Sequence, residues 1–174
     1  MENSSKEIIE FTLIYNRYKT KLYNYVLRMV GDKIICEDII QNVFMKLFEN
    51  LRGLKNKNSV GYWLFKTSRN EVYAFYRRKK VKVDQHGHEK LENVNIESTI
   101  NVENNFELKE MKELILQELN LLPVEQKDAY LLKEYGGLTY KEIASVLEIE
   151  EELVKSRLYK TRQKLIKRIS KIIL

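Results

Sequence analysis

The sequence is poor in the residues that interrupt helices. It contains six glycines and one proline in 174 residues. No long stretch alternates apolar and polar residues with the period of two that marks a half-buried strand. Apolar residues recur instead in steps of three and four, which is the spacing of an amphipathic helix. The scarcity of helix breakers and this spacing together predict an all-α fold.

Cysteine and long apolar runs are also nearly absent. Cys36 is the one cysteine, so no disulfide can form within the chain, and we expect a reducing compartment and a buried, inert thiol. No run approaches the roughly 20 apolar residues that span a bilayer. The opening residues, MENSSKEIIEF, lack the basic and apolar regions of a signal peptide. The sequence therefore predicts a cytoplasmic protein with no membrane insertion.

The combinations of residues that enzymes and metal sites need are lacking too. The two histidines, His86 and His88, flank Gly87 with no further His or Cys nearby. The chain has no paired carboxylates, no Gly-rich phosphate loop and no Ser, His or Cys constellation of a nucleophilic site. We therefore expect no catalytic residues, no metal site and no cofactor.

The charge is positive overall and unevenly distributed. Residues 1–80 hold 16 basic and 8 acidic side chains, residues 81–118 hold 4 and 9, and residues 119–174 hold 11 and 8. The net charges of these blocks are +8, −5 and +3, which give the total of +6. Two basic blocks separated by an acidic one predict two surfaces for a polyanion, held apart by a segment that binds none.

The spacing of apolar residues also predicts the organisation of the chain. Three helices are expected over about 6–30, 33–51 and 60–80, with Gly31 ending the first. Residues 81–105 lack Phe, Tyr and Trp and have no sustained period, which is typical of a linker. We therefore predict two small helical domains, over 6–80 and 106–174, joined by a flexible linker over 81–105.

Two turn signals are specific within the second predicted domain. Pro123 is expected at the first position of a helix over 123–135. Thr139 is followed three residues later by Glu142, which predicts a capping box at the start of the next helix. The second domain is therefore expected to hold four helices.

The helix predicted at 33–51 has an acidic and amide face within a basic block. Ile35, Ile39, Val43 and Leu47 form its apolar stripe, which is widened by Ile40, Phe44 and Phe48. The opposite face carries Glu37, Asp38, Gln41 and Asn42. A solvated surface is one interpretation of this polar face. A contact surface for a protein partner is the other.

The helix predicted at 60–80 mixes aromatic and basic residues. Cations bind phosphates and exposed aromatic rings stack on unpaired bases, although basic residues at a helix end also complement its dipole. We expect at least half of the aromatic side chains to be buried: Tyr62, Trp63, Phe65, Tyr73, Phe75 and Tyr76. The combination still favours nucleic-acid binding.

The strongest local pattern lies at 138–165. Ile143, Ala144 and Leu147 predict a short helix, three residues interrupt the spacing, and a second apolar stripe follows from Val154 to Ile169. The remaining faces of the second helix are crowded with cations: Lys155, Arg157, Lys160, Arg162, Lys164, Lys167 and Arg168. This is typical of a helix-turn-helix whose second helix enters a DNA major groove. A helix pair serving stability alone is the alternative, whereas a membrane-surface helix is disfavoured because the apolar stripe is needed as core.

Three segments in this order resemble a sigma-70 family RNA polymerase sigma factor of the extracytoplasmic-function (ECF) group. CEDIIQNVFMKLF (36–48) is similar to the segment that docks on the β′ clamp helices of the polymerase. WLFKTSRNEVYAFYRR (63–78) is similar to the helix that captures the promoter −10 element. Residues 122–165, which contain VKSRLYKTR, are similar to the domain that reads the −35 element. The resemblance covers about 11–80 and 106–168, and implies domains of the sigma-2 and sigma-4 types.

The resemblance also implies contact residues. Those expected to bind core polymerase are Glu37, Asp38, Gln41, Asn42 and Phe44. Those expected at the −10 element are Lys55, Lys57, Asn58, Trp63, Lys66, Arg69, Asn70, Tyr73, Arg77 and Arg78. Those expected at the −35 element are Thr139, Tyr140, Lys155, Ser156, Arg157, Tyr159, Lys160, Arg162 and Lys164.

The implied function is that of a non-catalytic subunit that directs promoter-specific initiation. Its expected partners are core RNA polymerase (the β′ clamp helices and the β flap), promoter DNA and an anti-sigma factor. The alternative is a stand-alone helix-turn-helix regulator that binds duplex operator DNA without polymerase.

The turn before the second helix departs from the family pattern. Where L-G-I-P is common, this chain has Leu147-Glu148-Ile149-Glu150, followed by Glu151 and Glu152. Acids in a first turn suit the helix dipole, but they repel phosphates and can accept a hydrogen bond from cytosine N4. The departure therefore bears on affinity for a typical −35 sequence.

Overall fold

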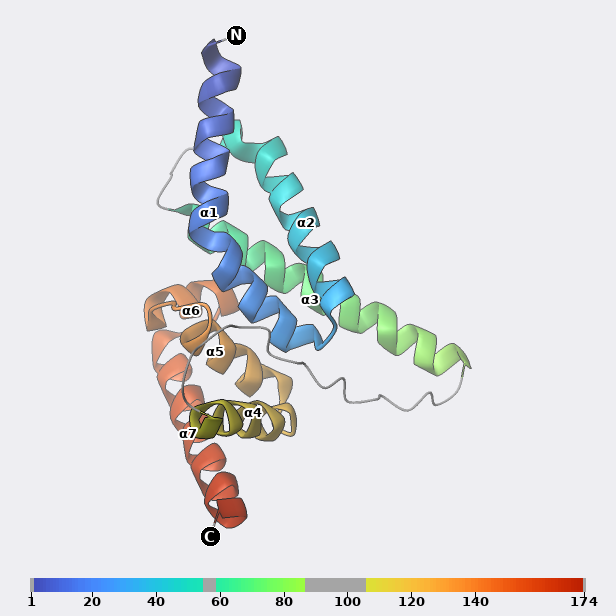
Figure 1. Ribbon diagram of the computed structural model, residues 1–174, viewed down its shortest axis with the longest axis vertical. Coiled ribbons are helices and arrows are strands. Elements are labelled where there is room, and N and C mark those ends of the chain that lie inside the picture. Colours follow the sequence, from blue (N-terminus) through green and yellow to red (C-terminus); the bar gives the residue numbers. More distant parts are fainter. Residues whose placement is uncertain (1, 55–58, 87–105, 174) are drawn as a thin grey trace. The chain divides into compact units, whose positions relative to one another are not determined.

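The chain is helical throughout the residues that the structure describes. The computed structural model describes residues 2–54, 59–86 and 106–173 (Figure 1). The elements are α1 (Glu2–Val30), α2 (Lys33–Asn50), the 3₁₀ turn η1 (Leu51–Gly53), α3 (Val60–His86), α4 (Phe106–Asn120), α5 (Val124–Glu134), α6 (Tyr140–Leu147) and α7 (Glu151–Ile173). No strand lies within these ranges, which confirms the all-α prediction.

The chain divides into two compact units, Met1–Asn95 and Ile96–Leu174. Helices α1, α2 and α3 pack with one another in the first unit, and α4 to α7 do so in the second. The third helix was expected to end near Lys80, but α3 continues to His86. The sequence has neither Gly nor Pro between Gly61 and Gly87, so nothing in it stops the helix earlier.

The first unit is held together by one apolar face from each of its helices. The fully or almost fully buried side chains are Leu22, Tyr25, Val26, Met29, Cys36, Ile39, Val43, Phe44, Leu47, Leu64, Phe65 and Val72. Burial of a side chain of this size stabilises the fold by about 1.5–3 kcal/mol. Gly31 ends α1 as predicted, with a φ of 73° that suits glycine.

The predicted burial of Cys36 is also confirmed. Its thiol is covered on all sides by the first unit. Burial raises the pKa of the Cys36 thiol to about 12, and the nearby charge of Glu37 adds to the effect. The thiol is therefore neutral at physiological pH, as an inert structural cysteine should be.

The expected burial of the aromatic residues on α3 is wrong. Phe65 is the one that is buried, Tyr62 is exposed, and Trp63, Tyr73, Phe75 and Tyr76 are half-buried. The reason is that α3 packs through a single face, which carries Leu64, Ser68 and Val72 at steps of four. Aromatic residues at other positions lie at the margin of this contact.

The second unit is a four-helix unit whose core comes from all four helices. Its buried apolar residues include Leu119, Leu122, Ala129, Leu131, Leu132, Ile143, Val146, Leu147, Val154, Leu158 and Leu165. Pro123 was expected inside the first turn of its helix, but it lies one position earlier, as the N-cap of α5. Its ψ of 140° is not helical, which is the conformation of a cap residue.

Candidate nucleic-acid and partner interfaces

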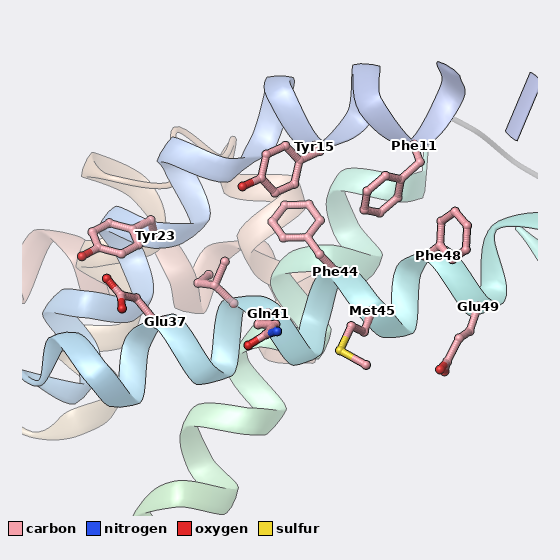
Figure 2. Close-up of a pocket in the computed structure, with 10 residues that line it drawn as sticks. Phe11, Tyr15, Tyr23, Glu37, Gln41, Phe44, Met45, Phe48 and Glu49 are labelled. Carbon is pink, nitrogen blue, oxygen red and sulfur yellow. The ribbon is translucent and has the colours of Figure 1, made fainter. Parts of the chain in front are cut away.

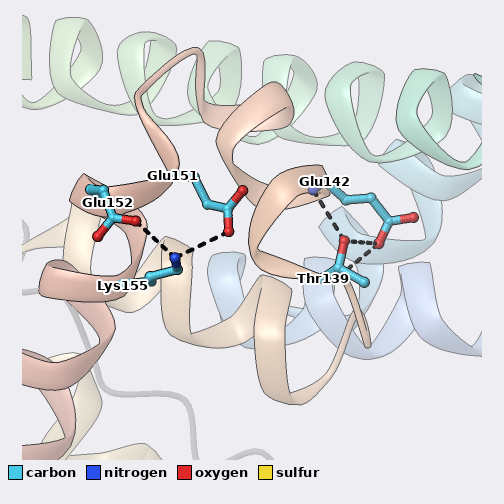
Figure 3. A network of polar contacts seen from close by, with 5 residues as sticks. All are labelled: Thr139, Glu142, Glu151, Glu152 and Lys155. Carbon is cyan, nitrogen blue, oxygen red and sulfur yellow. Dashed lines mark hydrogen bonds and ion pairs between the residues drawn. The ribbon is translucent and has the colours of Figure 1, made fainter.

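Helices α6 and α7 form the predicted helix-turn-helix. Thr139 caps α6, since its hydroxyl accepts from the Glu142 N–H at 3.2 Å and the Glu142 carboxylate accepts from the Thr139 N–H at 2.7 Å (Figure 3). This confirms the capping box and fixes the start of the helix. Most residues of the predicted apolar stripes are buried, namely Ile143, Leu147, Val154, Leu158, Thr161 and Leu165, whereas Ala144 and Ile169 are half-buried.

The turn between these helices depends on an unusual backbone conformation. Glu148 has a φ of 57° and a ψ of 45°, in the left-handed region that glycine prefers. In this conformation the N–H groups of Glu148 and Ile149 both donate to the Ala144 carbonyl, closing the C-terminus of α6. The chain thus makes the turn at the position where the family pattern has glycine.

The face of α7 that points away from the core carries three of the predicted contact residues, Ser156, Tyr159 and Lys160. Val154, Leu158, Thr161 and Leu165 are buried on the inner face. Ser156 and Tyr159 lie on the opposite face by helical spacing, and the Tyr159 ring is 64% exposed. Glu152 lies one turn before Ser156 on the same face. It is not among the residues that the sequence predicts as −35 contacts.

Several of the predicted cations of α7 are engaged within the unit. Arg162 donates to Glu134 at 2.8 Å, and hydrogen bonds to Glu134 and then to Tyr140 raise the pKa of its guanidinium. Lys164 donates to Gln126 at 3.3 Å. In the part of the chain that the structure describes, Arg157 and Lys160 make no ion pair, which leaves their charges to an external polyanion.

Lys155 is engaged by the first turn of its own helix. Its ammonium lies 2.8 Å from Glu152 and 3.3 Å from Glu151 (Figure 3). Hydrogen bonds to Glu152 and Glu151 raise the pKa of Lys155, so it stays charged across the physiological range. The basic character that the sequence suggests at this end of the helix is therefore partly neutralised.

The predicted face of α3 lies opposite its buried face. Lys66, Asn70, Tyr73 and Arg77 follow one another in steps of three and four, so they share one side of the helix, with Trp63 and Arg69 at its edges. The Arg69 guanidinium lies 4.3 Å from the centroid of the Tyr73 ring, a distance suited to a cation–π contact. Arg78 is exposed but lies away from this side. Lys55, Lys57 and Asn58 fall outside the described residues.

The outer face of α2 carries four of its five predicted contacts. Glu37, Asp38, Gln41 and Asn42 are all exposed. Phe44 differs from them because it is only 4% exposed and packs on Tyr15 of α1, with ring centroids 4.7 Å apart. Its predicted direct contact with a partner is therefore not supported by its position.

An apolar groove lies beside this face, between α1 and α2. It encloses about 560 Å³, and Figure 2 shows Phe11 and Tyr15 of α1 facing Phe44 and Phe48 of α2 across it. Phe48 is 50% exposed and Met45 is 54% exposed. Glu37 and Glu49 place negative charge at its edge. Sequence reasoning placed Phe48 in the core and made no use of Met45, because the helical period does not show how far α1 covers α2.

Both units match families of known proteins. Residues 14–81 match the family model for sigma-70 region 2, and residues 112–165 match the one for sigma-70 region 4. The chain is 30% identical to the RNA polymerase sigma factor SigZ of Bacillus subtilis, over 87% of this chain and 82% of SigZ. The chain belongs to the sigma-70 family of RNA polymerase sigma factors.

Other relatives place this sigma factor among ECF proteins. It is 29% identical to the ECF sigma factor SigM of Bacillus subtilis, over 87% of this chain and 90% of SigM. It is 26% identical to the ECF sigma-E factor of Escherichia coli K12, over 94% and 88% of the two chains. These matches favour a promoter-recognising sigma factor and not a stand-alone regulator.

Solved structures show the same fold. The sigma factor RpoE of Bartonella quintana, solved in complex with the anti-sigma factor NepR, aligns with a TM-score of 0.76 and 20% identity over 98% of both chains. CnrH, solved in complex with the cytosolic domain of CnrY, aligns with a TM-score of 0.66 and 16% identity over 92% and 87% of the two chains. NepR is the partner of RpoE, and CnrY is the partner of CnrH.

Two further findings concern the described residues of this sigma factor. Within residues 2–54, 59–86 and 106–173, no three His, Cys, Asp or Glu side chains cluster in a way that could hold a metal ion. Over the same ranges, no helix is both long and apolar enough to cross a bilayer.

Proposed function

We propose that this sigma factor docks on core RNA polymerase through the outer face of α2, captures the −10 element with α3 and reads the −35 element with α7. The proposal rests on the agreement between the family matches and the side chains exposed on the helices. Each unit matches one sigma-70 region, and the matched segment of each unit includes a helix with an outward face of basic and aromatic side chains.

Docking on polymerase is supported by the chemistry of the α2 face. Asp38, Gln41 and Asn42 are exposed polar groups in a unit that is otherwise basic. Such a face is poorly suited to DNA phosphates, because carboxylates repel them, but it suits a protein surface that offers cations. The β′ clamp helices are the proposed surface, and the β flap is the proposed partner of the second unit.

Capture of the −10 element is supported by the side of α3 that holds Lys66, Asn70, Tyr73 and Arg77. Tyr73 is half-buried, and an unpaired base is proposed to stack on the part of its ring that Arg69 does not cover. Arg77 and Lys66 supply positive charge for the adjacent phosphates. Extraction of a base from the duplex costs roughly a few kcal/mol, which stacking partly offsets.

Reading of the −35 element is supported by the placement of the cations on α7. Arg157 and Lys160 lie on the same side of α7, next to the outer face, and form no ion pair with the described residues, so they are the proposed phosphate contacts. Ser156 and Tyr159 lie on the outer face itself and are proposed to face base edges. Arg162 is proposed to contribute mainly to folding, since Glu134 already holds it.

An anti-sigma factor is a further proposed partner, and the cytoplasm is the proposed place of action. The groove between α1 and α2 supports the first point, since exposed apolar rings with an acidic edge suit an apolar segment flanked by cations. No catalytic step is proposed for this chain, because a sigma factor contributes binding and the polymerase performs the synthesis.

Reconstituted transcription tests the proposed function. The full chain is added to bacterial core polymerase with a library of genomic fragments, and the transcripts are sequenced. Promoter-dependent starts that require the chain are expected. A protein that shifts duplex DNA tightly on its own, and yields no such starts with polymerase, is instead a stand-alone regulator.

The docking surface can be tested by a double substitution on α2. Asp38→Ala with Gln41→Ala should weaken binding to core polymerase at least tenfold, because the loss removes one charged and one neutral hydrogen-bonding group from the interface. A titration of labelled chain with core polymerase measures the change. Glu113→Ala with Gln117→Ala removes the same groups from an exposed position on α4 and should leave the affinity unchanged. Equal affinities for the two double variants contradict the proposed docking face.

A further inference from the structure

Helix α7 holds two oppositely charged side chains in contact at its entrance. Glu152 is 84% exposed, and Lys155 Nζ lies 2.8 Å from its Oε1 atom (Figure 3). Lys155 Nζ also lies 3.3 Å from Glu151. An ammonium group has three N–H donors, so one is left after these two contacts, and the Oε1 atom of Glu152 has a second lone pair left to accept a hydrogen bond. The pair therefore offers an acceptor and a donor side by side.

This arrangement is complementary to the major-groove edge of a C·G base pair. Cytosine presents its N4 amino group as a donor, and guanine presents O6 and N7 as acceptors. N4 and O6 are hydrogen-bonded to each other within the base pair, so they lie about 3 Å apart. The 2.8 Å between Oε1 of Glu152 and Nζ of Lys155 matches that separation. Glutamate on cytosine and lysine on guanine are both favoured pairings.

The other three base pairs fit this arrangement less well. In the reversed pairs, G·C and T·A, an acceptor faces the carboxylate of Glu152 and repels it. In A·T, adenine offers its N6 amino group, but its N7 acceptor lies beside that group and thymine offers one acceptor and a methyl group. The charge order of the side-chain pair thus disfavours G·C and T·A. A·T has the same donor and acceptor order as C·G, and it is disfavoured by the N7 acceptor beside Glu152 and by the thymine methyl group.

We propose that Glu152 and Lys155 together select a C·G base pair within the −35 element, with cytosine facing Glu152. The inference rests on the proposed function, in which α7 enters the major groove and its N-terminal residues meet base edges. It also gives a role to the departure from the family pattern before α7, where this chain has Glu150, Glu151 and Glu152 in succession. The preference for this base pair therefore depends on Glu152, a side chain in which this chain differs from the family pattern.

A promoter library randomised over the −35 element tests the inference. Holoenzyme is assembled from the full chain and core polymerase, and the promoters of the resulting transcripts are sequenced. The wild-type chain should enrich C·G over other pairs roughly tenfold at one position, the scale of a single well-placed side-chain contact. Glu152→Gln should shift the preference at that position to A·T, because glutamine pairs with adenine N6 and N7.

Two further variants separate base reading from charge. Glu151→Gln removes the same charge from the same turn but keeps Glu152, so it should raise transcription from all sequences and retain the C·G preference. Lys155→Met should reduce discrimination between C·G and A·T at the same position, because the guanine contact is lost. Both sites are at the surface, and circular dichroism checks that each variant is folded.

The inference is overturned by either of two results with an active wild-type holoenzyme. One is the absence of a C·G preference at every −35 position. The other is the same base preference in wild type and Glu152→Gln. A third result contradicts the proposed function instead. In that case the wild-type holoenzyme starts no promoter-dependent transcript from any member of the library.

Discussion

At the scale of single residues, the buried hydroxyl of Ser68 is the clearest departure from good packing. Ser68 is fully buried on the inner face of α3, and its hydroxyl finds no hydrogen-bond partner among the described residues. An unpaired buried hydroxyl costs on the order of 1 kcal/mol or more, because it has left water without a replacement bond.

Substitution of Ser68 by alanine should therefore stabilise the first unit. Ser68→Ala is expected to raise the free energy of unfolding by about 1 kcal/mol, which urea titration followed by fluorescence of Trp63, the one tryptophan, can measure. Ala74→Ser makes the reverse change at a half-buried position on the same helix. Its effect on the free energy of unfolding measures the difference in helix propensity between alanine and serine. A gain for Ser68→Ala no larger than that effect shows that the hydroxyl is satisfied.

At the scale of elements, the turn between α6 and α7 depends on the conformation of Glu148. A residue with a Cβ pays about 1–2 kcal/mol to occupy the left-handed region, and glycine does not. The turn nevertheless forms, because the flanking apolar faces of α6 and α7 bury Ile143, Leu147 and Val154 only when the chain reverses here. Tertiary packing thus imposes a backbone conformation that the local sequence disfavours.

Glu148→Gly is accordingly expected to stabilise the second unit by about 1 kcal/mol. Thermal unfolding followed by circular dichroism measures the change. Glu150→Gly is the matched control, since it removes the same side chain two residues away, where φ is not positive, and should be neutral or destabilising. Equal effects of the two substitutions contradict the strain at Glu148.

At the scale of the whole molecule, the chain presents two units, each with a basic surface, separated by an acidic stretch. Residues 81–118 carry a net charge of −5, which disfavours their own binding to DNA. Neither unit then needs high affinity alone, because binding of one raises the effective concentration of the other at the promoter. The covalent connection between the units is therefore expected to make a large contribution to promoter binding.

Separation of the two units should expose this contribution. Residues 1–95 and 96–174 supplied as separate chains with core polymerase are expected to form the promoter complex 10²–10⁴-fold less effectively than the intact chain at equal concentration. A titration of promoter-dependent transcription against the concentration of the second fragment measures the difference. Fragments as effective as the intact chain contradict a role for the connection.

The sequence by itself determined the presence of the helices and some of their caps, because these depend on neighbours within a few residues. The period of three and four, the capping box of Thr139 and Glu142, and the glycine after α1 all act locally, and all are found in the structure. The motifs were equally local, which is why both sigma-70 regions could be inferred from contiguous segments.

Only the tertiary structure decided which side chains on a given face are covered and which charges are already paired. The same apolar stripe of α2 contains the buried Phe44 and the half-exposed Phe48, because α1 covers one more fully than the other. Lys155 and Arg162 look alike in the sequence, yet one is held by its own helix and the other by α5. Burial and ion pairing depend on elements distant in sequence, so a helical period alone cannot supply them.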